Sequence, residues 1–212
     1  MNTLMFPRGG SLLSRCMILA MAVLFSLLAA GCTAPPPKTK VETVLSTAKL
    51  EPSKVYVFID HSLSFTHMSS RYADSRRERH TAAKALFAQK FEERKIDAVI
   101  DTHITSYPVM WQGVWLRAAS LGASHVLILV DENVSVYRAN PGADPTIIGT
   151  EQKASYFELP ARGGGGKPTL LYETSFSTDE TCVGVSAVVC NGFVPNHLMA
   201  RLDANRLLEK SR

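Results

Sequence analysis

The chain has 212 residues, of which 46% are apolar and 20% are charged, a balance typical of one globular domain with short extensions. Its formal net charge is +4, and 21 basic residues remain against 19 acidic ones once Arg8 and Arg15 are subtracted from 23. Nucleic-acid binding needs a concentrated basic field, so this charge argues against a nucleic-acid partner.

Residues 1–31 are predicted to form a secretory signal peptide. Arg8 and Arg15 precede an apolar run, residues 16–30, that is broken only by Ser26. A helix of that length spans about 22 Å, less than the ~30 Å hydrocarbon core of a bilayer. We therefore expect export and cleavage rather than a permanent membrane span.

The apolar run ends in LLAAGC, which resembles the lipobox of bacterial lipoproteins. The resemblance implies cleavage behind Gly31, after which Cys32 becomes the mature N-terminus and carries three acyl chains, palmitate among them. Thr33 stands where lipoproteins of the inner membrane often carry aspartate. The resemblance thus implies an outer-membrane lipoprotein whose domain faces the periplasm. An exported protein with an incidental cysteine is the alternative.

Residues 32–53, which begin CTAPPPK, are proline-rich and then polar, without a sustained apolar stripe. This composition predicts a partly extended tether between the lipid and the domain.

Residues 54–212 are predicted to form one periplasmic domain of the α/β (α+β) class, with the order β-α-β-α-β-β-β-α. Apolar runs predict strands, whereas an S-x-x-E capping box at Ser75 and Glu78 and apolar residues at helical spacing predict helices. We expect a mixed sheet with helices packed on it. The expected strands are 55–60, 98–105, 125–139, 155–159 and 169–177, and the expected helices are 75–94, 111–122 and 196–210.

Cys182 and Cys190 are the cysteines that remain after the signal peptide is removed and Cys32 is lipidated. An even pair in an oxidising compartment predicts a disulfide bond. Two free thiols or a metal pair are the alternatives, and no histidine or third cysteine nearby supports a metal.

The element order, together with short stretches such as LGASHVLIL, resembles the small α/β domains of curli-secretion lipoproteins and of lipoproteins that activate penicillin-binding proteins. This resemblance implies a protein that assembles, docks or activates an envelope machine and catalyses nothing itself. It implies an envelope or cell-wall partner and no cofactor.

The stretch FIDHSLS, residues 58–64, resembles the metal-ion-dependent adhesion site of von Willebrand factor A domains. By that resemblance Asp60, Ser62, Ser64 and Asp131 would hold Mg²⁺ through oxygen ligands. Aspartate and serine also form turns at strand ends, and we favour that interpretation, with no metal. A third hypothesis is a periplasmic hydrolase that uses Asp60 and Asp131.

Two further stretches bear on partners. ARGGGGKPT, residues 161–169, lacks the first glycine and the final hydroxyl of a phosphate-binding loop and lies between predicted strands, so we expect no nucleotide. SSRYADSRRERH, residues 69–80, concentrates four arginines near a helix start and hints at an anionic partner such as lipid headgroups. A solvated helix face is the alternative. From the sequence we expect a lipid-anchored binding or assembly protein rather than an enzyme.

Overall fold

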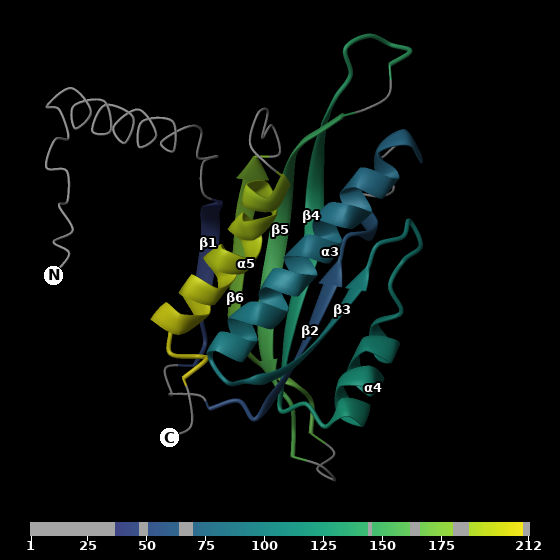
Figure 1. The fold of residues 1–212 in the computed structure, drawn as a ribbon. Helices are drawn as coiled ribbons and strands as arrows, with labels where there is room; N and C mark the ends of the chain where they lie inside the picture. The colour runs from purple at the N-terminus through teal and green to yellow at the C-terminus, as the bar shows by residue number, and fades with distance from the viewer. Residues whose placement is uncertain are drawn as a thin grey trace, which may run out of the picture. The chain divides into compact units, whose positions relative to one another are not determined.

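The computed structural model describes residues 37–46, 51–63, 70–143, 146–161, 166–179 and 187–209. These residues form six strands and three helices, in the order β-β-α-β-α-β-β-β-α (Figure 1). The elements are β1 (Lys38–Val44), β2 (Lys54–Asp60), α3 (Ser70–Glu93), β3 (Asp97–His103), α4 (Trp111–Leu121), β4 (His125–Tyr137), β5 (Thr146–Glu158), β6 (Thr169–Asp179) and α5 (Ala187–Ala204).

The strands form one mixed sheet in the order β1-β6-β5-β4-β2-β3. β2 pairs in parallel with β3 and with β4, and the helices α3 and α4 provide the two crossovers. The later half is antiparallel, because β4, β5, β6 and β1 pair successively in opposite directions. The predicted α/β class, with a single domain and a mixed sheet, is confirmed.

The first strand corrects the prediction for residues 32–53. Lys38–Val44, which lies within the predicted, partly extended tether, belongs to the domain as an edge strand that pairs with β6. Most of its side chains are exposed, and the strand therefore shows no buried apolar pattern in the sequence.

Both long helices begin earlier than predicted. α3 starts at Ser70, so the Ser75–Glu78 capping box lies inside the helix and not at its beginning. α5 starts at Ala187 rather than near Asn196, and it contains Pro195, which cannot donate a backbone hydrogen bond. In contrast α4 ends as predicted. Gly122 adopts φ 68°, and its N–H donates to the backbone carbonyls of Ala118 and Ala119 in the last turn.

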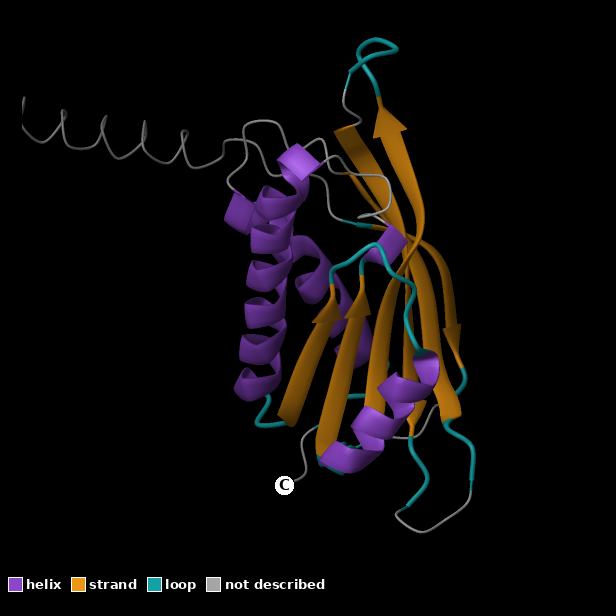
Figure 2. Ribbon diagram, turned by 90° about the vertical axis from the view of Figure 1, so that its right-hand side faces the viewer, coloured by secondary structure: helices purple, strands orange, loops and turns teal. Residues whose placement is uncertain are grey.

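The helices divide between the two faces of the sheet (Figure 2). Val57, Ile59, Leu127 and Leu129 point to the face covered by α3 and α5, where Phe87, Phe91, Leu198 and Leu202 complete the main core. Tyr56, Phe58, Val126 and Ile128 alternate to the other face and pack against Val114 and Ala118 of α4. The alternation of side chains along buried strands thus supplies two cores from the same strands.

The single helix on the second face leaves the antiparallel half of that face polar. Its side chains form cross-strand ion pairs, Lys40 with Glu151 and Lys153 with Glu173, the latter at 2.9 Å. Cross-strand pairs of opposite charge stabilise a solvated sheet face modestly.

No helix in the described part of the chain is long and apolar enough to cross a membrane.

Candidate functional site

Asp60 and Asp131 lie at the carboxyl ends of neighbouring parallel strands but on opposite faces of the sheet. Asp60 is in register with Val130, so Asp131 is one residue further along and points to the other side. Asp131 thus shares the α3 and α5 face, whereas Asp60 shares the α4 face. The structure does not bring the two carboxylates together as the adhesion and hydrolase hypotheses require.

Asp60 and Ser62 form a local turn. The Asp60 carboxylate accepts a hydrogen bond of 2.9 Å from the backbone N–H of Ser62, and Ser62 and Leu63 are helical. An aspartate that accepts the N–H two residues on is the usual way in which this residue ends a strand or caps a helix. Ser64, the remaining member of the hypothetical ligand set, lies outside the described residues.

Asp131 belongs to a buried polar cluster with His61 and Gln152. Both carboxylate oxygens lie 3.2 Å from Nδ1 of His61, and Nε2 of Gln152 donates to Oδ1 at 2.8 Å. Because the carboxylate can only accept, His61 carries a proton on Nδ1. The ring of His61 also stacks on that of His80 in α3, with ring centroids 3.6 Å apart.

This cluster is built to hold helix and sheet together. The His61 and Asp131 side chains are 7% and 0% exposed, so a substrate has little surface by which to approach the pair. The histidine–carboxylate pair resembles the base and its orienting group in hydrolases, and its burial argues against that use. In the described part of the chain, no three His, Cys, Asp or Glu side chains form a group that could hold a metal ion.

An exposed apolar surface lies between β3 and α4, and the sequence interpretation did not identify it. Tyr107 is 75% exposed, Met110 80% and Trp111 42%, so three large apolar side chains are exposed within five positions. We call these three residues the β3–α4 surface. The available signal was an aromatic residue, a methionine and a tryptophan around Pro108, which the helical pattern of α4 obscured.

The β3–α4 surface is anchored to the sheet at both ends. Nε2 of His103 donates to the backbone carbonyl of Tyr107 at 2.7 Å, which fixes the start of the loop to the end of β3. Trp111 packs edge-on against Phe58 of the second core, with ring centroids 6.1 Å apart. The surface is therefore presented in a defined geometry and not on an unattached loop.

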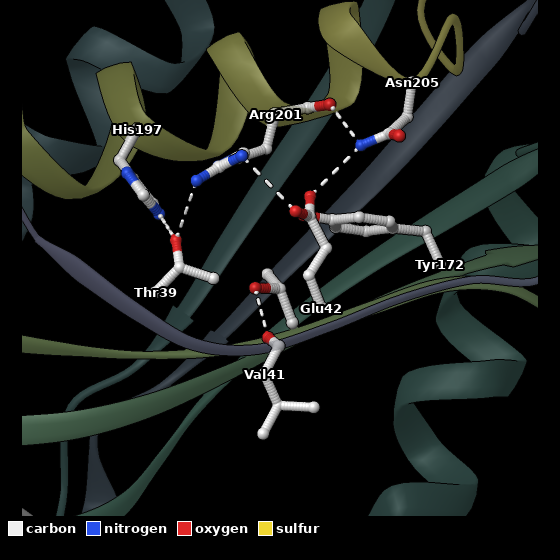
Figure 3. A network of polar contacts seen from close by, with 8 residues as sticks. Thr39, Val41, Glu42, Tyr172, His197, Arg201 and Asn205 are labelled. Carbon is white, nitrogen blue, oxygen red and sulfur yellow. Dashed lines mark hydrogen bonds and ion pairs between the residues drawn. The ribbon is translucent and has the colours of Figure 1, made fainter.

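A polar network joins the edge strand β1 to α5 and β6 (Figure 3). The Glu42 carboxylate accepts hydrogen bonds from the Tyr172 hydroxyl at 2.8 Å, from Asn205 at 3.1 Å and from Arg201 at 3.3 Å. Thr39 accepts a second bond from Arg201 at 3.2 Å and lies 3.2 Å from Nε2 of His197. We call these six residues the β1 clasp, because they hold β1 to elements more than a hundred positions away.

The surroundings of the β1 clasp favour the neutral form of His197 and the protonated hydroxyl of Tyr172. Burial lowers the pKa of His197, and the neighbouring Arg201 guanidinium lowers it further. Burial and the bond to Glu42 raise the pKa of Tyr172 well above its usual value. Both shifts favour the uncharged forms of the imidazole and the phenol.

Of the three cysteines that the predictions concern, the structure describes one. Cys32 and Cys182 lie outside the described residues, and Cys190 lies in the first turn of α5. Lipid attachment at Cys32 and the Cys182–Cys190 disulfide stay predictions.

The sequence matches no protein family profile and no curated protein. Among solved structures, a PelC dodecamer from Paraburkholderia phytofirmans is similar at 14% identity and a TM-score of 0.43, covering 81% of this chain and 99% of that one. A hypothetical protein from Chlamydia trachomatis aligns at 10% identity and a TM-score of 0.36, over 73% of this chain and 97% of that one. A minor lipoprotein from Acinetobacter baumannii aligns at 11% identity and a TM-score of 0.26, over 75% of this chain and 98% of that one. Because all three TM-scores are below 0.5, these similarities establish neither a family nor a function.

Proposed function

We propose that the protein is a lipid-anchored, non-catalytic binding protein of the cell envelope. In this proposal Cys32 holds the chain in the outer membrane, the domain faces the periplasm, and the β3–α4 surface docks an envelope protein. The lipobox-like LLAAGC supports the anchor, and three acyl chains would make the attachment effectively permanent.

The observation that carries the proposal is the exposure of Tyr107, Met110 and Trp111 in a fixed geometry. Tyrosine, tryptophan and methionine are enriched where proteins dock, because they supply a large contact area and methionine adapts its shape. A protein partner fits these side chains better than a small substrate, because exposed aromatic and methionine side chains are the contacts that protein interfaces use.

Site-specific photo-crosslinking in living cells tests the docking surface. A photoreactive residue at Met110 should give one discrete adduct, whose partner is then identified by mass spectrometry. Leu116 is the matched control, because it is 64% exposed on the same helix but lies about 140° around the axis from Trp111. Adducts of equal yield at both positions would contradict a specific surface.

A paired substitution gives a second test. Tyr107→Ser with Met110→Ser should abolish the adduct of a photoreactive residue at Gln112 while leaving thermal stability near that of the wild type, because both side chains are largely exposed. An adduct that survives the double substitution would show that the partner binds elsewhere.

The anchor has its own test. Cys32→Ser should block lipid attachment and leave uncleaved precursor held by its signal peptide. Metabolic labelling with an alkynyl fatty acid, followed by membrane fractionation, measures both effects. Unlabelled wild-type protein in the soluble fraction would refute the anchor.

A further inference from the structure

The stretch between the proposed anchor and the first strand is short. Five residues, 33–37, separate Cys32 from Lys38, the first residue of β1. Even a fully extended chain spans at most about 20 Å over this distance. Lys38 must therefore lie within about 20 Å of the membrane that holds the acyl chains.

The β4–β5 hairpin extends in the same direction by a similar distance. Lys38 is in register with Ser177 of β6, which pairs with Glu151 of β5, and Glu151 pairs with Asn133 of β4. From Asn133 the chain continues to Arg138, about 17 Å beyond the level of Lys38 at the usual rise of a strand. Figure 1 shows the hairpin projecting past the start of β1 at the upper end of the domain.

The side chains near the tip of this hairpin suit a membrane interface. Tyr137 is 58% exposed, Val136 is 40% exposed, and Arg138 follows them on the surface. Tyrosine combines an apolar ring with a hydroxyl that prefers the headgroup layer, and arginine binds phosphate oxygens. We call Val136, Tyr137 and Arg138 the hairpin tip.

The beginning of α3 adds positive charge at the same end. α3 runs antiparallel to β2, and His80 stacks on His61 at the carboxyl end of that strand. Ser70 therefore lies about 15 Å beyond this level, toward the hairpin tip. The ten residues from Ser70 to Arg79 contain four arginines and two acidic residues. Basic residues near an anionic leaflet are attracted to its surface.

We propose that this end of the domain rests on the membrane, with the hairpin tip in the headgroup layer of an anionic phospholipid bilayer. The proposal rests on the lipid anchor of the proposed function and adds the orientation of the domain. It leaves the β3–α4 surface well short of the hairpin tip: His103, the last residue of β3, is level with Asp60 and hence with Val130, seven residues or about 23 Å below Tyr137. The domain would thereby hold its protein-docking surface at a fixed height in the periplasm.

The competing orientation places the outer edge of β1 on the membrane, because Val41 is 60% exposed and Leu45 57%. That orientation turns the unpaired backbone groups of an edge strand toward lipid, where they lose their water partners. It also removes the arginines of α3 from the anionic surface. Val41 is consequently the matched control for Tyr137.

Quenching of tryptophan fluorescence by brominated lipid distinguishes the two orientations. The full-length lipidated protein is purified from membranes as two variants, Tyr137→Trp and Val41→Trp, and inserted into vesicles of phosphatidylethanolamine and phosphatidylglycerol. Each variant is measured in two vesicle preparations, one with plain lipids and one whose lipids carry bromine on acyl carbons close to the headgroups. The wild-type protein supplies the background emission of Trp111 and Trp115.

We expect bromine to remove most of the emission added by Tyr137→Trp and little of that added by Val41→Trp. Replacing phosphatidylglycerol with phosphatidylcholine should weaken the quenching, since the anionic charge is lost. Quenching of Val41→Trp instead, or of neither variant while the protein stays on the vesicles, would overturn the proposed orientation but leave the anchor intact. A wild-type protein that does not stay on the vesicles would overturn the anchor itself, and the orientation with it.

Discussion

Glu42→Ala should release the edge strand β1, because Glu42 is the acceptor on which the β1 clasp depends. The substitution leaves the Tyr172 hydroxyl, whose residue is fully buried, without its partner at 2.8 Å. A buried donor that loses its acceptor costs about 1–3 kcal/mol. The lost bond to Arg201 adds little to this cost, because the Arg201 side chain is 40% exposed and water can replace the carboxylate as its partner. Asn205 keeps its bond to the carbonyl of Arg201 at 2.9 Å.

We therefore expect Glu42→Ala to lower the free energy of unfolding by about 2 kcal/mol, measured by urea denaturation of the mature chain. Glu42→Gln, the matched control, keeps an acceptor for the phenol and should cost less than about 1 kcal/mol. Adding Tyr172→Phe to Glu42→Ala removes the stranded hydroxyl, so the double variant should recover part of the loss.

Hydrogen exchange locates the effect. In Glu42→Ala the amides of β1 should exchange faster, while those of β4 and β2 in the centre of the sheet keep their protection. Equal acceleration across the sheet, or a variant as stable as the wild type, would refute the idea that the clasp holds β1 in place.

Three further predictions concern stability and covalent structure. Gly122→Ala should lower the free energy of unfolding by about 1 kcal/mol, because Gly122 has a positive φ of 68°. Gly113→Ala in α4 should raise it by about 0.5–1 kcal/mol, because an added Cβ meets nothing within 4 Å. Thermal unfolding measures both changes. Burial and the neighbouring guanidinium lower the pKa of His197 in the folded state. Below pH 6.5, the usual pKa of histidine, the unfolded chain therefore binds the proton more readily than the folded one, so the free energy of unfolding should decrease as the pH is lowered. His197→Gln should weaken this pH dependence, measured by denaturation at a series of pH values. The unreduced, denatured protein should show no reactive thiol at Cys182 or Cys190, and labelling of both by a thiol reagent would refute the disulfide.

The features that were predictable from the sequence are those set by neighbouring residues. β2 and the first half of β4 are continuous apolar runs, and α4 ends at a glycine that can adopt a positive φ, so each carries its own local indication. β1 carries none, because it is an exposed edge strand whose partners come from the other end of the chain. Glu42 and Arg201 are separated by 159 positions, and no local pattern predicts such a contact.

The FIDHSLS stretch shows where a correct local prediction stops short of a site. The strand end at Asp60 and the apolar strand before Asp131 were both predicted, and parallel strands do bring the two residues to the same edge of the sheet. Whether they can act together depends on the register, because side chains alternate between faces and a shift of one residue reverses the outcome. In this chain Asp60 pairs with Val130, so the residue that shares a face with Asp131 is His61, and the contact that forms is the buried His61–Asp131 pair. The carboxylate that resembled a metal ligand instead orients a histidine that stacks on α3, and the polar cluster links the first crossover helix to the centre of the sheet.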